Sequence, residues 1–433
     1  MLSASSIESK LRARSLPGLS QHVRSDGFVM PSYDGLGIAN VPATLAALFG
    51  AELPATCPPL QRELWSGWLD GLRRVVLVVV DALGYLQLRS AMAADDGLVF
   101  HELAAAGRLV PLTSTFPSTT NAVLTTLWSG YSPAAHGVLA YELYLRELGV
   151  AASTLFFWPV YHRERDVLSA WGIDTETFVP VPSLAGQLSQ HGITTRLFLS
   201  KAYVASMLSR IHTRDVRQAY GFVGAGDMWL GLQRVIDQHR QEKLLLAAYW
   251  DTIDGITHQY GPDDDAWTME LCGLSTMMRR AFLERLTPAQ REGTLLLLLA
   301  DHGGLPTPRR AAIRLSDHAP LRDALSLPPV GENRAVFLHA RGDTLARLRR
   351  YVEDELGSSF VTLSREQVLS SGLLGPGPVY EETPHRLGDL VCLAKDDHYL
   401  ARDDYQLKML GRHGGLSAQE MLVPLLGVRL DAL

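Results

Sequence analysis

The sequence predicts an α/β fold: a three-layer α/β/α sandwich with a mostly parallel central sheet and a small inserted α/β subdomain. Two observations lead to this fold class. Short, almost uninterrupted apolar runs alternate along the chain with longer patterns of helical period, which is the order of elements in three-layer α/β domains. Several of these runs also lead directly into aspartate or histidine, as expected where the strands of an open α/β sheet end at a ligand site.

The predicted strands are rich in leucine and β-branched residues. They span residues 73–81, 108–114, 194–200, 243–251, 294–301, 334–340, 389–395 and 422–430. Runs this continuously apolar are typical of strands that are covered on both faces, as in parallel sheets. The longest of them, "VVLVVV" and "LLLLLA", have the length of a strand and are far too short to span a membrane.

The predicted helices lie between these strands. Apolar residues recur at helical spacing in 181–192, 229–242, 269–286 and 343–357. A further helix is expected over 121–128, because the hydroxyl residues before it have the composition of a helix start. No internal repeat is visible, so the chain is expected to form its fold from one set of alternating strands and helices.

Two parts of the chain depart from the regular alternation. Residues 1–60 are mixed in composition and punctuated by proline and glycine, and we expect them to wrap the outside of a main domain formed by residues 61–433. Residues 305–405 have a strand–helix–strand pattern of their own, with "GLLGPGPVYEETPHRLGD" as a long loop. We therefore expect an inserted subdomain over 305–405, within the main domain.

Composition narrows the class of protein further. The 433 residues carry a net charge of -6 with no run of like charge, which disfavours a nucleic-acid polymer as partner but allows a small anionic substrate. The three cysteines are scattered, so neither a disulfide framework nor a cysteine zinc site is expected. The N-terminus lacks the apolar core that a secretory signal has. We expect a cytoplasmic protein that does not bind membranes, and the sequence leaves its oligomeric state open.

Acidic and imidazole side chains gather where the predicted strands end. The residues concerned are Asp81, Asp251, Asp254, His258, Asp301, His302 and His413. A single aspartate after a strand is usually a turn or cap residue, whereas a set at several strand ends indicates a shared site. Carboxylate and imidazole together suit zinc, with manganese or iron as alternatives. Two ions a few ångströms apart would clamp the attacking and leaving oxygens of a phosphoryl displacement.

The order of these motifs resembles the alkaline phosphatase superfamily, most closely its type I phosphodiesterase/nucleotide pyrophosphatase family. The resemblance rests on the strand-end Asp81, Thr120 at a helix start, "DGITHQYGP" (254–262), "DHGG" (301–304) and "HGG" (413–415), and it covers about residues 74 to 425. It implies an alkaline-phosphatase-like catalytic domain. The string "CPPLQR", which begins at Cys57, superficially resembles the cysteine motif of sulfatases. A sulfatase is nevertheless disfavoured, because the arginine stands one position away from its place in that motif and because the cysteine precedes Asp81 in the chain.

The resemblance also implies a role for each ligand residue. Asp254, His258 and His413 would hold one divalent ion, and Asp81, Asp301 and His302 the other. Thr120 would bridge toward the pair of ions, most simply Zn²⁺ with Mn²⁺ as the alternative, and would accept the phosphoryl group.

Several hydroxyls compete with Thr120 for the role of nucleophile. In the family the nucleophile precedes a glycine by ten residues, and the histidine of an "HG" pair follows that glycine by six. Here Gly130 and His136 fit this spacing and select Thr120, whereas Thr115 lies five residues too early. Ser118 and Thr119 remain candidates for the helix cap. His136 is expected to hold its turn by a hydrogen bond.

Substrate contacts are expected from Asn121, beside the nucleophile, and from Tyr141, which stands where related pyrophosphatases carry a phosphate-binding asparagine. The aromatic run 156–161 is expected to be core, with a pocket wall as the alternative. Arg412 is the one arginine close in sequence to a ligand residue, and its side chain could face away.

The predicted function is hydrolysis of phosphodiester or pyrophosphate bonds in a small phosphorylated substrate, through a covalent phosphothreonine at a binuclear metal site. Diesters are expected to react faster than monoesters, because the sequence places no further cation for the extra charge of a monoester. The alternatives are a phosphonate hydrolase, which "TN" at 120–121 also suits, a phosphomonoesterase, or a metal-stabilised binding protein without turnover. No P-loop motif is present.

Overall fold

The computed structural model describes residues 3–19, 23, 27–54, 57–162 and 164–433. Its centre is a seven-stranded sheet in the order β2-β18-β9-β1-β8-β6-β7. The strands are β1 (Arg74–Val80), β2 (Arg108–Thr113), β6 (Thr194–Ser200), β7 (Gln218–Phe222), β8 (Leu244–Trp250), β9 (Thr294–Leu299) and β18 (Leu422–Arg429). Only β18 runs antiparallel to its neighbours in this sheet. The predicted mostly parallel sheet is therefore confirmed.

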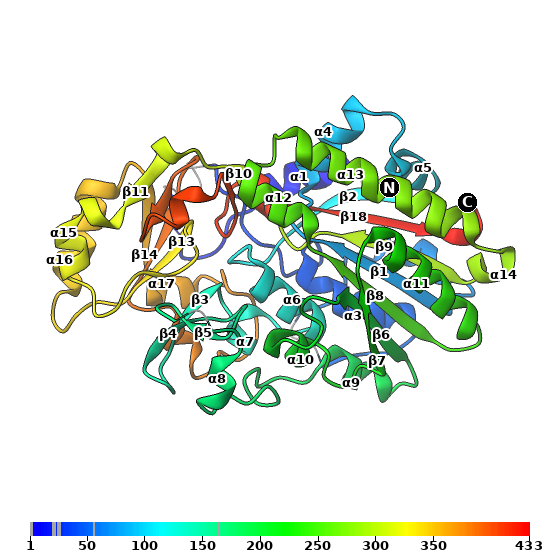
Figure 1. The fold of residues 1–433 in the computed structure, drawn as a ribbon, viewed down its shortest axis with the longest axis horizontal. Coiled ribbons are helices and arrows are strands. Elements are labelled where there is room, and N and C mark those ends of the chain that lie inside the picture. The colour runs from blue at the N-terminus through cyan, green and yellow to red at the C-terminus, as the bar shows by residue number, and fades with distance from the viewer. Residues whose placement is uncertain (1–2, 20–22, 24–26, 55–56, 163) are drawn as a thin grey trace.

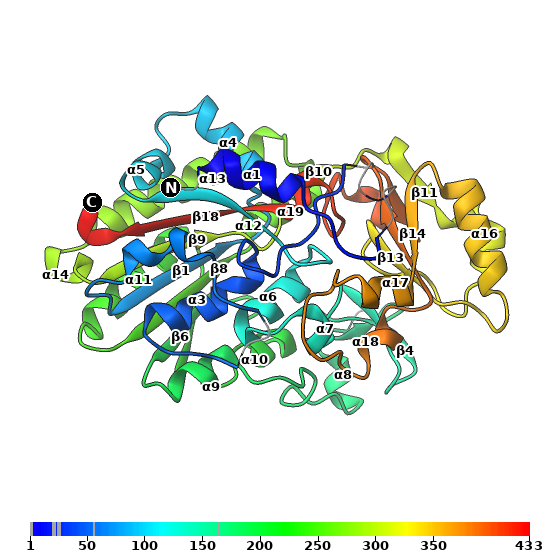
Figure 2. The same ribbon diagram turned by 180° about the vertical axis from the view of Figure 1, so that it is seen from behind.

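Helices cover both faces of this sheet. Figure 1 shows α11 and α13 in front of it, and Figure 2 shows α3 on the opposite face. Every side chain from Val75 to Val80 of the central strand β1 is fully buried, which explains why all of these positions are apolar. The predicted three-layer architecture is confirmed.

The described helices extend along the whole chain. They are α1 (Ala4–Arg12), α3 (Val41–Leu48), α4 (Tyr85–Ala94), α5 (Val99–Ala106), α6 (Thr120–Ser129), α7 (Pro133–His136), α8 (Val167–Ala170), α9 (Leu184–Ser189), α10 (Met207–His212), α11 (Ala225–Gln238), α12 (Thr252–Tyr260), α13 (Asp265–Met277), α14 (Pro288–Arg291), α15 (Ala319–Asp323), α16 (Leu345–Leu356), α17 (Arg365–Ser370), α18 (Thr383–Arg386) and α19 (Ala418–Met421). Among the residues that the structure describes, no helix has both the length and the apolar character needed to cross a bilayer.

A second seven-stranded sheet lies beside the first, in the order β14-β15-β13-β12-β3-β4-β5 (Figure 1). It is antiparallel throughout. Its strands are β3 (Glu142–Leu145), β4 (Val150–Ser153), β5 (Trp158–Pro159), β12 (Val330–Gly331), β13 (Ala335–Leu338), β14 (Phe360–Ser364) and β15 (Leu390–Ala394). The sheet thus joins residues 330–394 to residues 142–159.

The helix α16 packs on this second sheet through a single stripe. Leu348, Val352 and Leu356 are buried, and their spacing of four residues places them on one face of the helix. They belong to an apolar cluster that is separate from the core of the central sheet. Two short pairs complete the strands: β10 (Leu305–Pro306) with β17 (Gly411–Arg412), and β11 (Ala312–Arg314) with β16 (Tyr399–Ala401).

The described part of residues 1–60 lies against the central sheet. Ile7 and Leu11 of α1 are buried, and α1 lies with α3 on the side seen in Figure 2. The Val29 backbone N–H donates to the Leu416 carbonyl (2.8 Å), and Gly37 forms a bridge with Thr113 at the end of β2. The segment therefore reaches the loops that follow β2 and precede β18. The three cysteines form no disulfide with one another.

His136 is a fully buried residue at the end of α7. The backbone N–H of Val138 donates to its Nδ1 (3.1 Å), and its Nε2 lies 3.0 Å from Thr126 Oγ1. Because Nδ1 accepts, the proton of the neutral ring is on Nε2 and is donated to the threonine. The predicted role of His136, holding its turn by hydrogen bonds, is confirmed.

Burial lowers the pKa of His136 to about 3. In the unfolded chain the pKa is about 6.5, so between these values the unfolded state binds a proton that the folded state does not bind. This histidine therefore destabilises the fold progressively as the pH falls below about 6.5, by about 1.4 kcal/mol per pH unit.

We expect His136→Gln, which cannot titrate, to be less stable than the wild type at neutral pH and to lose less stability on acidification. Denaturant unfolding of both metal-free proteins at about pH 7, 6 and 5 measures the difference. If the unfolding free energies of the two proteins fall in parallel over this pH range, the lowered pKa of His136 is contradicted.

Candidate active site

The strands β8, β1 and β9 end at one edge of the central sheet. They are adjacent and parallel, and Val80 of β1 pairs with Trp250 of β8. Asp81 follows β1 directly, Asp301 follows β9 after one residue, and α12 starts directly after Asp251 at the end of β8. The topology therefore brings the strand-end carboxylates together, as expected for an α/β sheet.

The first cluster of side chains, here the Asp81 group, consists of Asp81, Asp301 and His302. The His302 Nε2 atom lies 3.3 Å from Asp81 Oδ1 and 3.5 Å from Asp301 Oδ2. All three side chains are buried. Thr120 adjoins the group: its Oγ1 lies 3.2 Å from His302 Nε2 and 3.4 Å from Asp81 Oδ2.

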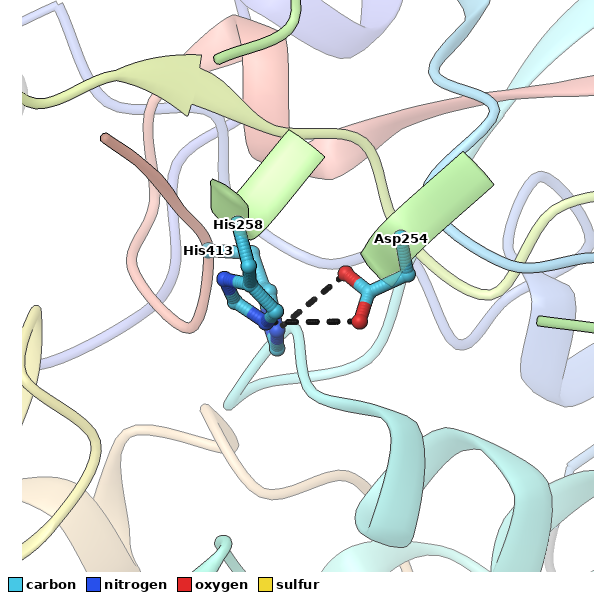
Figure 3. A group of neighbouring side chains, drawn as sticks. All are labelled: Asp254, His258 and His413. Carbon is cyan, nitrogen blue, oxygen red and sulfur yellow. Dashed lines mark ion pairs between the residues drawn. The ribbon is translucent and has the colours of Figure 1, made fainter. Parts of the chain in front are cut away.

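The second cluster, the Asp254 group, consists of Asp254, His258 and His413, and Figure 3 shows both imidazoles turned toward the carboxylate. The Nε2 atom of His258 lies 3.3 Å from Asp254 Oδ2, and that of His413 lies 3.8 Å from Asp254 Oδ1. The two clusters are neighbours, because the rings of His302 and His413 stack with centroids 3.7 Å apart.

The backbone orients each of these imidazoles in the same way. The Nδ1 atoms of His258, His302 and His413 lie 2.9, 2.9 and 3.0 Å from the carbonyl oxygens of Gly411, Gly303 and Ser118. A carbonyl can only accept, so each Nδ1 carries the proton and each Nε2 has a free lone pair that faces the carboxylates. This is the arrangement by which proteins prepare histidines to bind a metal ion.

The carboxylates of both clusters lack the partners that burial requires. Oδ1 of Asp81, Oδ1 of Asp254 and Oδ2 of Asp301 are buried without a hydrogen bond in the described structure. Burial, with the charges of Asp301 and Asp254, raises the pKa of Asp81 well above its usual value, and burial raises the pKa of Asp301 to about 7. A buried charge without a partner is strongly unfavourable, and a bound cation removes the penalty. The residues therefore fit divalent metal ions.

Thr120 is the first residue of α6, and the start of this helix has no side-chain cap. Thr119 occupies the N-cap position, but neither its side chain nor that of Ser118 caps the helix. Ser118 Oγ donates to the Gly415 carbonyl (2.8 Å), and Thr119 Oγ1 donates to Glu332 Oε1 (2.6 Å). The first N–H groups of α6 thus have no side-chain acceptor, which is the condition for binding an anion. Thr115 is fully buried and donates to the Pro117 carbonyl (3.3 Å).

The residues expected to contact substrate, Asn121 and Tyr141, both adjoin Thr154, whose backbone N–H donates to the Tyr141 carbonyl (2.8 Å). Asn121 is buried, and its Nδ2 donates to Thr154 Oγ1 (2.6 Å). Tyr141 lines a small pocket with Glu332 and Arg402, on the side of the second sheet. Its ring meets the Phe156 ring edge-on at 6.2 Å.

Arg412 is directed away from the site. Its guanidinium stacks on Tyr399 at 3.5 Å and donates to Thr307 Oγ1 (2.6 Å) and the Met409 carbonyl (2.9 Å). No lysine or arginine among the described residues forms an ion pair with the carboxylates of either cluster.

A cavity of about 320 Å³ opens from the cluster edge and is lined there by Asp81, Thr120 and Asp254. Asp251, which the sequence also places at a strand end, lines the cavity but belongs to neither cluster. Six apolar side chains, here called the apolar wall, also line the cavity: Leu124, Trp128, Leu155, Phe156, Leu199 and Leu208. The aromatic run 156–161 is therefore divided: Phe156 lines the cavity, Phe157 is fully buried, and Tyr161 is exposed.

Sequence reasoning missed two residues that support the site. The Tyr249 hydroxyl donates to Asp81 Oδ2, but this tyrosine lies in an apolar strand and has the pattern of a core residue. Glu332 accepts from Thr119 Oγ1 and from the Tyr141 backbone N–H (2.7 Å). Its distance from Thr119 in the sequence leaves no local signal.

The model of the type I phosphodiesterase/nucleotide pyrophosphatase family matches residues 75–416, and the chain belongs to this family. The family is part of the alkaline phosphatase superfamily, so the resemblance seen in the sequence is confirmed. No curated protein matches the chain.

Solved structures of two kinds share the fold. Human ectonucleotide pyrophosphatase/phosphodiesterase 5 superposes with a TM-score of 0.62 at 15% identity, over 82% of this chain and 87% of that chain. An inactive variant of the murine protein, solved with AMP, gives 0.59 at 15% identity over 82% and 88%. Phosphonoacetate hydrolase from Sinorhizobium meliloti, solved with phosphonoformate, gives 0.59 at 16% identity over 84% and 94%.

Proposed function

We propose that this protein is a metal-dependent hydrolase that cleaves phosphodiester or pyrophosphate bonds in small molecules, with Thr120 as the nucleophile. One observation carries the proposal: the Thr120 hydroxyl stands at an uncapped helix start, 3.2 Å from His302 Nε2 and 3.4 Å from Asp81 Oδ2. A hydroxyl in this place is close both to the candidate metal ligands and to free backbone N–H groups.

The Asp81 group and the Asp254 group would each hold one divalent ion, zinc or manganese. Bound there, such ions supply positive charge to the phosphate oxygens and favour loss of the Thr120 proton. The three histidines each offer Nε2, while their Nδ1–H groups donate to backbone carbonyls. Tyr249 fixes one oxygen of Asp81 by donating to it.

The reaction proceeds in two displacements. The Thr120 oxygen forms a bond to phosphorus, the bond to the leaving oxygen breaks, and the leaving group departs as an alcohol, phenol or phosphate. Water then attacks the phosphorus, releases the remaining ester arm as its phosphate and returns the proton to Thr120. The N–H groups at the start of α6 hold the phosphate oxygens during both steps.

We expect diesters to react faster than monoesters. A monoester dianion has an additional charged oxygen that requires a further cation or donor. Arg412 is engaged with Tyr399 and Thr307, and Arg165, the one described Lys or Arg that lines the cavity, lies over the Phe156 ring of its apolar wall. The second ester group of a diester instead finds the apolar wall of the cavity.

The test is to assay protein reconstituted with zinc or manganese on bis-p-nitrophenyl phosphate, p-nitrophenyl phosphate, phosphonoacetate and a panel of nucleotide sugars. The proposal predicts a higher kcat/KM for the diester than for the monoester. A monoester value about tenfold above the diester value would reverse the preference. Turnover of phosphonoacetate alone would make the protein a phosphonate hydrolase, and no turnover at all would make it a binding protein.

A further inference from the structure

Arg165 stands in the cavity on the side of the apolar wall. It lies between β5 and α8, is exposed, and lines the same cavity as Thr120. Its guanidinium carbon lies 4.8 Å from the centroid of the Phe156 ring. This cation–π contact holds the guanidinium in place without using its hydrogen-bond donors.

The guanidinium of Arg165 has no hydrogen bond or carboxylate partner within the described residues. The acidic residues beside it in the sequence are engaged elsewhere: Glu164 pairs with His162 (3.1 Å), and Asp166 Oδ1 accepts from the Met207 backbone N–H (3.2 Å). Its donors are therefore available to a ligand.

Arg165 is also the only lysine or arginine among the described residues that line this cavity. The other charged groups there, Asp81, Asp251 and Asp254, are acidic. His212 lines the cavity as well, but burial lowers its pKa to about 3, so it is neutral at neutral pH. The cavity thus has a metal-binding end, an apolar wall and one positive charge beside that wall.

We infer that Arg165 selects phosphodiesters whose retained ester arm has an apolar or aromatic body and ends in an anionic group. This inference rests on the proposed function and names its substrate class. The phosphate would be held at Thr120, the body of the arm against the apolar wall, and the terminal carboxylate or phosphate by the guanidinium, which matches planar anions with two parallel donors. An arm that ends in a cation is disfavoured by the same charge.

Three p-nitrophenyl phosphodiesters test this inference, because they share one leaving group and differ only in the charge of the retained arm. The arms are 4-carboxybenzyl, benzyl and 4-(trimethylammonio)benzyl. In the metal-loaded wild type we expect kcat/KM for the carboxylate arm to exceed that for the benzyl arm by about three- to tenfold, and the cationic arm to be the poorest. Added salt should reduce this preference.

Variants of Arg165 assign the preference to one side chain. In Arg165→Met the ratio of the anionic to the neutral substrate should fall to about one, and in Arg165→Glu the cationic arm should become the best. Arg62→Met is the matched control: Arg62 is also exposed and stacks on an aromatic ring, that of Trp65 at 4.2 Å, but it does not line the cavity. Its ratio should equal that of the wild type.

The outcomes separate the inference from the function on which it rests. Hydrolysis of all three diesters without a preference for the anionic arm, or with the same preference in Arg165→Met, would overturn the role of Arg165 and leave the hydrolase standing. If the metal-loaded wild type hydrolyses none of them, the proposed function fails and the inference fails with it.

Discussion

Thr120→Ala is expected to lose nearly all turnover, by a factor of roughly a thousand or more, while it retains its fold and its metal ions. The substitution removes the attacking oxygen and leaves both ligand clusters in place. Among the described residues, this hydroxyl interacts only with His302 and Asp81. Steady-state kinetics on a diester, with circular dichroism and elemental analysis on the same preparation, measure all three properties.

Two further variants sharpen this test. Thr120→Ser keeps a hydroxyl at the helix start and should keep part of the activity. Thr115→Ala is the control, because Thr115 is buried, is held by the Pro117 carbonyl and does not line the cavity. Wild-type rates in Thr120→Ala together with a severe loss in Thr115→Ala would show that Thr120 is not the nucleophile.

Removal of the metal ions is the second change with a large expected effect. Protein purified without chelator should contain close to two transition-metal ions per chain, and chelation should abolish turnover. Asp254→Ala or His413→Ala should each lower the content toward one, because both residues belong to the Asp254 group. Elemental analysis of the purified variants measures the stoichiometry.

A histidine outside both clusters provides the control for this experiment. His136 is bound to Thr126 and to the backbone of Val138, so His136→Gln should keep the wild-type metal content. A metal content near zero in an active wild-type enzyme would contradict the binuclear site.

The central sheet and both ligand clusters could be predicted because their signals are local in the sequence. The strand β1 is apolar from Val75 to Val80 and is followed directly by Asp81, and Asp254 and His258 are one helical turn apart. The edge strand β7 was missed, because its first four residues are partly or fully exposed and it lacks the apolar run of a central strand.

Features built from distant segments were not predictable in this way. The second sheet joins β12 to β3, and short strands such as β5 have no pattern of their own. Ser118 and Thr119 have the local signature of a cap, but the fold provides Gly415 and Glu332 as their partners. Arg165 and the apolar wall meet only in the folded chain. Sequence patterns therefore predict the residues at the strand ends, but they do not predict the contacts between those residues and distant loops.

The central claim is that Thr120 becomes covalently bonded to phosphorus during turnover. Rapid acid quenching of the metal-loaded enzyme with a diester, followed by mass spectrometry of its peptides, measures this bond directly. The account predicts that the peptide containing Thr120 gains the mass of the phosphoryl group with its retained ester arm, and that Thr120→Ala gains none. Turnover at the wild-type rate with no modified peptide, or with the added mass on a different residue, would contradict it.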